Sequence, residues 1–195
     1  AGFDAVESPL FSPDGATIAF TGIKNGYSDV YTASVDGNNL RRLTNDRWYD
    51  TSAAWFPGGS KIVYASLRNG ITHLYTLDFA DGKTDQLTSG EHNDDMPDVS
   101  PDGKYIAFTS SGTSGIYDLC RMDLQSKEIT RLTNVKIGVF SPRFSPDGKH
   151  LAFSAYEDGC TNVNVTDFDP GSAPAVVQAQ PAVAEPGAVT SAVAP

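Results

Sequence analysis

The sequence predicts an all-β fold: a β-propeller, or a propeller segment, built from four four-stranded blades. One turn motif followed by a strand-like segment occurs four times, at intervals of 44, 44 and 45 residues. Apolar and polar residues alternate after each turn, which is the period of a β-strand and not of a helix. Other landmarks recur in phase with the turn. A repeat of this length with four short strands is typical of a propeller blade. The copies of the motif begin at Ser12, Phe56, Ser100 and Ser145.

The repeated motif reads Ser-Pro-Asp-Gly in three copies and Phe-Pro-Gly-Gly in the second. Proline suits the second position of a type I turn because its φ is already fixed near the required value. Aspartate is tolerated at the third position, and glycine takes the positive φ that follows. The motif therefore predicts a tight turn between the first and second strands of every blade. The structural glycines of these turns are Gly15, Gly59, Gly103 and Gly148.

The two outer strands of each blade are indicated by an Asp-x-Tyr-like segment and by a Leu-Thr pair. The first lies at residues 29–31, 73–75, 118–120 and 162–164, and the second at 43–44, 87–88 and 132–133. The fourth copy has no Leu-Thr pair, and residues 175–178 are the candidate for its last strand. The predicted blades span about 8–44, 52–88, 96–133 and 141–178.

The composition changes at Pro170. The last 26 residues contain eight Ala, five Pro and five Val, with Glu185 as the only charged residue. Proline interrupts both helices and strands, and no periodicity remains. We expect propeller repeats over residues 1–169 and an extended Ala/Pro/Val-rich tail over 170–195.

The repeats resemble the TolB-type β-propeller repeat, which is marked by Ser-Pro-Asp-Gly-Lys-x-Ile-Ala-Phe, then Asp-Ile-Tyr, then Leu-Thr. The resemblance covers residues 8 to about 168, and the second and fourth copies depart from it most. It implies a non-catalytic protein-interaction or scaffold module, an accessory subunit of an envelope or membrane-associated complex located outside the cytoplasm, in the periplasm. It implies protein partners, which we expect the 170–195 tail to help bind.

Two other functions stay open at this stage. Similar repeats occur in the propeller of prolyl-oligopeptidase-type serine peptidases, whose catalytic domain would then lie outside this chain. The central channel of a propeller could also bind a small ligand or a cation. The chain has no Gly-x-Ser-x-Gly segment, which favours the non-enzymatic interpretation, and nothing in the sequence indicates a cofactor.

Charge argues against two kinds of partner, and hydropathy argues against a membrane-spanning segment. Fourteen basic and 24 acidic residues give a net charge of −10, which disfavours binding to nucleic acid and to anionic lipid. No apolar run approaches the roughly 18 residues of a membrane-spanning helix. We therefore expect no transmembrane segment, although the chain could still bind a membrane complex.

Acidic residues fall near the start of three inner strands, where a propeller lines its channel: Glu7, Asp50 and Asp94. They could bind a cation or a basic peptide. The more conservative interpretation is that each aspartate accepts backbone N–H groups in its own loop. Trp48 and Tyr49 lie in the loop between the first two blades, and they are the best candidates for an exposed contact surface.

The remaining candidates favour structural roles. Trp55 precedes a turn on an inner strand and is expected in the core. Cys120 and Cys160 lie on the third strands of neighbouring blades, too far apart for a disulfide, so we expect two small buried side chains. The three histidines, His73, His92 and His150, have no metal-ligand spacing, so no metal site is expected.

Overall fold

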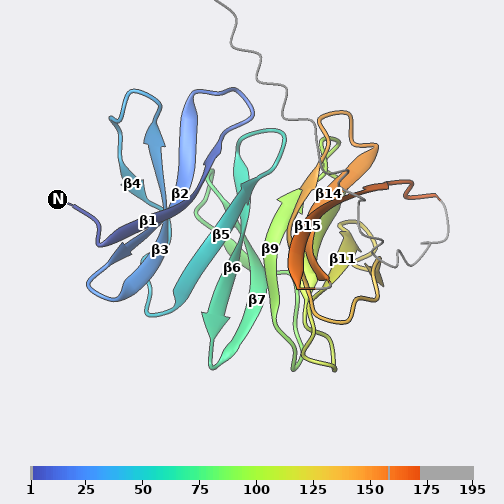
Figure 1. Cartoon of the computed structure of the whole chain (residues 1–195). Helices are drawn as coiled ribbons and strands as arrows, with labels where there is room; N and C mark the ends of the chain where they lie inside the picture. The colour runs from blue at the N-terminus through green and yellow to red at the C-terminus, as the bar shows by residue number, and fades with distance from the viewer. Residues whose placement is uncertain (1, 158, 172–195) are drawn as a thin grey trace, which may run out of the picture.

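The computed structural model describes residues 2–157 and 159–171, and all its regular elements are β-strands (Figure 1). The fifteen strands are β1 (Ala5–Phe11), β2 (Thr17–Lys24), β3 (Tyr27–Ser34), β4 (Arg41–Arg42), β5 (Tyr49–Trp55), β6 (Lys61–Arg68), β7 (Ile71–Asp78), β8 (Thr84–Gln86), β9 (Asp94–Val99), β10 (Tyr105–Ser110), β11 (Asp118–Asp123), β12 (Ile129–Arg131), β13 (Val139–Phe144), β14 (His150–Glu157) and β15 (Cys160–Asp167).

The strands form four antiparallel sheets, each a meander of strands that are consecutive in sequence. Strands β1–β4, β5–β8 and β9–β12 make three four-stranded blades, and β13–β15 make the fourth. The structure confirms the predicted four-blade propeller or propeller segment. The fourth strand predicted for the last blade, at residues 175–178, lies outside the described residues.

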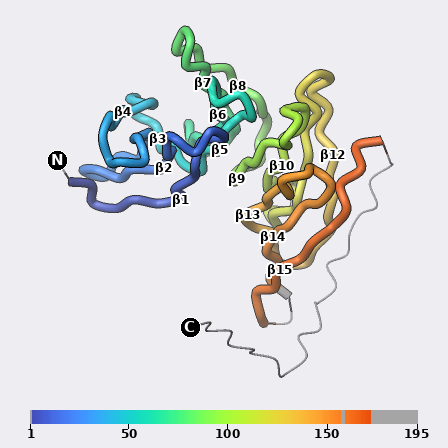
Figure 2. The backbone as a smooth tube through the Cα atoms, turned by 90° about the horizontal axis from the view of Figure 1, so that it is seen from above, coloured from blue at the N-terminus to red at the C-terminus, as the bar shows by residue number. Residues whose placement is uncertain are grey.

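The blades follow one another in chain order around a common centre (Figure 2). The first strand of each blade packs against the first strand of the next, so that β1 contacts β5, β5 contacts β9, and β9 contacts β13. Within the described part of the chain, no comparable packing joins a strand of the first blade to a strand of the fourth. Among the same residues, no helix is long and apolar enough to cross a bilayer.

Three apolar clusters fill the spaces between consecutive blades and hold the propeller together. Their members come from the alternating apolar positions of the predicted strands: Val30 with Tyr64, Leu74 with Phe108, and Leu119 with Phe153. Each of these six side chains is at most 2 % exposed. In the second and third blades, a period of two thus gives the second and third strands one face towards the preceding blade and one towards the next. Trp55 is buried as expected.

The repeated turns have the geometry that their residue types require. In the first copy, the Gly15 N–H donates to the Ser12 carbonyl at 2.8 Å, and the Ser12 hydroxyl donates to Asp14 at 2.6 Å. Gly15, Gly103 and Gly148 each have a φ of 71°, and that of Gly59 is 68°. Consecutive turns also lie against one another. A Cβ added at Gly148 would be 3.4 Å from the Pro101 ring of the preceding blade.

Candidate functional site

The start of β5 lies at the junction between the first and second blades, where Asp50 is completely buried. One oxygen of its carboxylate accepts a hydrogen bond from the Ser66 hydroxyl on β6, and the other has no partner among the described residues. The Arg68 Nε donates to the same hydroxyl at 3.0 Å, and its guanidinium lies 3.8 Å from Asp46. Asp50 is therefore the inner end of a polar chain that reaches the surface at Asp46.

Burial raises the pKa of Asp50 above its ordinary value, because removal from water disfavours the charged form more than the Ser66 hydrogen bond favours it. The native state then holds a proton at pH values where the unfolded chain has lost it. Stability consequently falls as pH rises from the usual carboxyl range through the raised pKa. The contribution of Asp50 at neutral pH is thus unfavourable.

We expect Asp50→Asn to be more stable than the parent at about pH 7, by about 1 kcal/mol, because the parent must either bury a charge or take up a proton on folding, and asparagine, which has the same shape, does neither. The gain should shrink towards about pH 5, and thermal unfolding at several pH values measures it. Asp36→Asn is the control, since Asp36 is exposed and hydrogen bonds from Asn38 lower its pKa. Equal pH dependence in the parent and Asp50→Asn would contradict this explanation.

Asp94, at the start of β9, occupies the same place between the second and third blades. It is completely buried, and neither carboxylate oxygen has a hydrogen-bond partner among the described residues. Two histidine rings approach one of these oxygens, His73 through Nδ1 at 3.8 Å and His92 through Nε2 at 3.7 Å. The fold brings together residues whose sequence spacing gave no indication of a cluster.

The repeat explains why the second blade differs here. Position 73 corresponds to Asp29 in the first blade and Asp118 in the third, where the carboxylate pairs at 2.6 Å with an arginine on the outer strand. In the second blade that arginine is replaced by Gln86, whose amide donates instead to the Thr88 carbonyl. In the aligned repeats, histidine replaces the acidic residue and glutamine replaces the arginine in the same blade. This double replacement could have identified His73 as a candidate site residue.

Three sequence candidates lie elsewhere. Glu7 is exposed and one residue beyond the position of Asp50 and Asp94, which Val6 occupies in the first blade. Trp48 lies in the loop between blades, half-buried, with the Arg47 guanidinium 4.5 Å from its ring centroid. Tyr49 is 42 % exposed, but it is the first residue of β5 and not part of the loop. The five candidates therefore do not form one site.

The cysteines are both free, as expected. Cys120 is buried, and burial raises the pKa of its thiol to about 12, so it remains a neutral packing group. The expectation that Cys160 is buried was wrong: it is exposed at the start of β15, because no further blade covers this strand in the described part of the chain. Within residues 2–157 and 159–171, no three His, Cys, Asp or Glu side chains are arranged to hold a metal ion.

Comparison with known proteins adds to this geometry. The family model described as the TolB beta propeller domain matches residues 3–138. The Tol-Pal system protein TolB of Anaeromyxobacter dehalogenans (strain 2CP-C) is 41 % identical over 46 residues, which are 24 % of this chain and 11 % of that protein. The chain thus spans only a small part of this relative.

Solved structures agree with the family match. A structure assigned to TolB from Agrobacterium tumefaciens has a TM-score of 0.77 and 28 % identity, covering 88 % of this chain and 65 % of that one. A puromycin hydrolase shares the fold at a TM-score of 0.67 and 20 % identity, over 88 % of this chain and 30 % of the hydrolase. With 136 of 195 residues inside the family model and the repeated turns in place, the chain belongs to the TolB β-propeller family.

Proposed function

We propose that this chain is a non-catalytic protein-interaction module, an accessory subunit of an envelope or membrane-associated complex that works outside the cytoplasm. The match to the TolB propeller domain carries this proposal, and it is supported by a relative named for the Tol-Pal system. The partners would accordingly be proteins. The net charge of −10 agrees with a partner other than nucleic acid.

The last blade offers a surface that suits such a role. Strands β3, β7 and β11 each pair with a short outer strand, whereas β15 has no partner on that side among the described residues. Val163 and Val165 on β15 are 69 % and 65 % exposed. An unpaired strand edge can accept an added strand through main-chain hydrogen bonds, while exposed side chains select its sequence.

We propose that the segment 170–195 takes part in attachment. Residues 175–178 would supply the missing outer strand of the last blade, and the residues beyond Gln180 would contact a neighbouring subunit. The composition of the segment supports its attachment to another surface, because Ala, Pro and Val in this mixture do not form a packed core alone. Ordering each residue costs on the order of 1–2 kcal/mol, which only burial against another surface offsets.

Deletion of residues 180–195 tests the attachment role. We expect the thermal stability of the propeller to change little, while the amount of protein that co-purifies with its native membrane assembly falls several-fold. The control keeps the length and replaces residues 180–195 with a Gly/Ser sequence, which should behave like the deletion if specific contacts matter. A truncated protein that loses stability yet assembles normally would show that the segment only supports its own fold.

The second candidate is the propeller of a prolyl-oligopeptidase-type serine peptidase. Three structures of puromycin-hydrolysing enzymes support this candidate only at the level of fold, because their sequence identities to this chain are 21 %, 20 % and 16 %. In the described residues, no serine hydroxyl is hydrogen-bonded to a histidine ring. Labelling of a serine in the purified chain by a fluorophosphonate probe would favour this candidate over the interaction module.

A further inference from the structure

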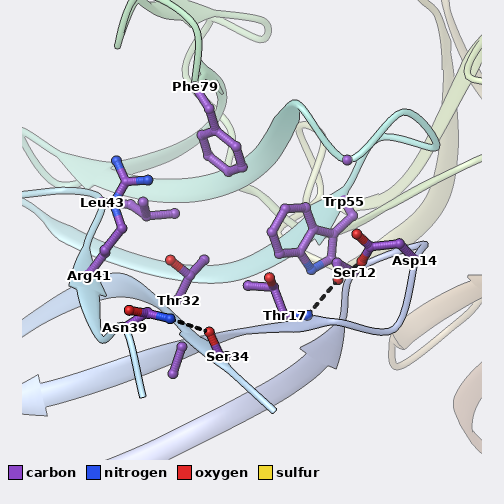
Figure 3. Close-up of a pocket in the computed structure, with 12 residues that line it drawn as sticks. Ser12, Asp14, Thr17, Thr32, Ser34, Asn39, Arg41, Leu43, Trp55 and Phe79 are labelled. Atoms are coloured by element: carbon purple, nitrogen blue, oxygen red, sulfur yellow. Dashed lines mark hydrogen bonds between the residues drawn. The ribbon is translucent and has the colours of Figure 1, made fainter. Parts of the chain in front are cut away.

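A cavity of about 270 Å³ lies between the first and second blades. Figure 3 shows the rings of Trp55 and Phe79 on one side, Thr17 and Thr32 opposite them, and Arg41 at one end. The Trp55 Nε1–H donates to the Leu10 carbonyl at 3.2 Å, so the only polar atom of the indole is already hydrogen-bonded and the ring offers the cavity an apolar surface. The second blade therefore supplies an aromatic wall, and the first blade supplies hydroxyl groups.

At one other junction of the repeat, the chain's own side chains fill the equivalent space. Between the third and fourth blades, the positions of Trp55 and Phe79 are occupied by Phe144 and Phe168, whose ring centroids are 4.9 Å apart at 87°. A third ring, that of Tyr105, lies edge-on to Phe168 at 5.4 Å. The Arg121 guanidinium lies 5.9 Å from the Tyr105 centroid and 6.0 Å from the Phe168 centroid. The chain's own side chains thus complete three rings and a cation.

The cavity between the first and second blades, called the first cleft below, has the equivalent pair of aromatic rings but lacks the third ring. The centroids of Trp55 and Phe79 are 5.6 Å apart at 83°, close to the geometry of the equivalent pair. The position of Tyr105 is Thr17 in the first blade, where a small side chain leaves the space open. In the second blade the same position is Lys61, whose ammonium lies 5.3 Å from the Phe56 ring centroid. The combination of an aromatic pair with a small facing residue is therefore specific to the first cleft.

The position of Arg121 is Thr32 in the first blade, but another arginine, Arg41 on the paired outer strand, lies at one end of the cavity. Arg41 is exposed, and its side chain makes no hydrogen bond or ion pair with any other residue that the structure describes. Its neighbour Arg42, by contrast, pairs with Asp29 at 2.6 Å. A free guanidinium at the end of an aromatic-walled cavity is suited to a carboxylate, which it can bind through two parallel hydrogen bonds.

We propose that this cavity binds an aromatic carboxylate. The ring of the ligand takes the place that Tyr105 fills between the third and fourth blades, edge-on to Phe79, and its carboxylate pairs with Arg41. The hydroxyl groups of Thr17 and Thr32 line the opposite wall. The same chemistry is offered by a free small molecule and by the C-terminal aromatic residue of a peptide. The site is distinct from the strand edge of the last blade.

Isothermal titration of the full chain with 3-phenylpropionate tests the ring. We expect binding at one site, and we expect it to be abolished in Thr17→Tyr, which introduces the side chain present at position 105. Thr17→Ser is the matched control and should bind like the parent. Because Thr17→Tyr fills a cavity, its thermal stability should equal or exceed that of the parent. Unchanged binding by a folded Thr17→Tyr variant, or no binding by the parent, would overturn the proposal.

The substitution Arg41→Gln tests the role of the ligand's carboxylate. It should weaken the binding of 3-phenylpropionate about tenfold, as expected for the loss of one partly exposed ion pair. The neutral 3-phenylpropanamide should bind the parent about tenfold more weakly and be insensitive to this substitution. Arg47→Gln removes the same charge outside the cavity and should have no effect. Equal affinities of acid and amide would refute the role of Arg41. Tighter binding of acetyl-Ala-Ala-Phe than of the free acid would identify a peptide terminus as the source, and the reverse a small molecule.

Discussion

Replacement of Asp118 by alanine is expected to lower the free energy of unfolding by about 3 kcal/mol. Asp118 is 4 % exposed, and it accepts hydrogen bonds from the Thr133 hydroxyl at 2.9 Å and from the Val135 N–H at 3.0 Å. It also pairs with Arg131 at 2.6 Å. Alanine leaves two buried donors without an acceptor, and each unsatisfied group costs roughly 1–3 kcal/mol. Urea unfolding followed by circular dichroism measures the loss.

Arg131→Gln is the matched control, because glutamine is the natural residue at the corresponding position of the second blade, Gln86. The Arg131 side chain is 51 % exposed, so its ion pair contributes at most about 1 kcal/mol. Asp118→Ala should therefore be clearly less stable than Arg131→Gln. If the two variants unfold at the same urea concentration, the buried hydrogen bonds do not hold this outer strand.

The repeat period made the fold predictable, because each landmark residue has a local physical role. Glycine is needed where the turn requires a positive φ, and alternating residues are needed where a strand has two covered faces. A bulge in the first strand of every blade escaped prediction. It lies at a residue with a φ of 51–54°, namely Ser8, Ser52, Met96 and Ser141.

Serine and methionine give no signal for that conformation, since left-handed backbone is normally indicated by Gly, Asn or Asp. The bulge matters for the site because it fixes which residues of the strand face the neighbouring blade. Because the bulge recurs at the same place in each blade, Val6, 44 residues before Asp50, takes the position of Asp50 and Asp94. Glu7 lies near the start of its inner strand as expected, but one residue further along, which on a strand means the opposite face.

The candidate sites were less predictable than the fold because they depend on contacts between blades. His92 lies two residues before Asp94, whereas only the packing of β7 against β9 brings His73 to the same carboxylate. The cavity likewise results from the small size of Thr17 opposite Trp55, two residues from neighbouring blades. At both sites the residues differ from those at the equivalent positions of the other blades, and an alignment of the repeats shows these differences. The alignment does not show which of the differing residues are in contact, because the packing of one blade on the next decides that.

Replacement of Gly148 by valine is expected to destabilise the fold by about 2–3 kcal/mol. A β-branched residue at a φ of 71° is strained by roughly 1–2 kcal/mol on its own. A Cβ at this position would also lie in van der Waals contact with Cδ of Pro101, at 3.4 Å, so we expect the added Cγ methyl groups of valine to press on the turn of the preceding blade. The same reasoning gives a smaller contact contribution at Gly103, where the nearest atom, Cδ of Pro57, lies 3.6 Å away.

Gly15→Val separates strain from packing, because Gly15 has the same φ of 71° and a Cβ added there would have no heavy atom within 4 Å. We expect it to lose only the backbone contribution, about 1–2 kcal/mol, and Gly148→Val to lose more. The difference measures how strongly consecutive turns hold each other in place, which is the interaction that links one blade to the next at this edge. Equal losses would show that the turns are strained independently, and parent-like unfolding of Gly148→Val would refute the turn assignment.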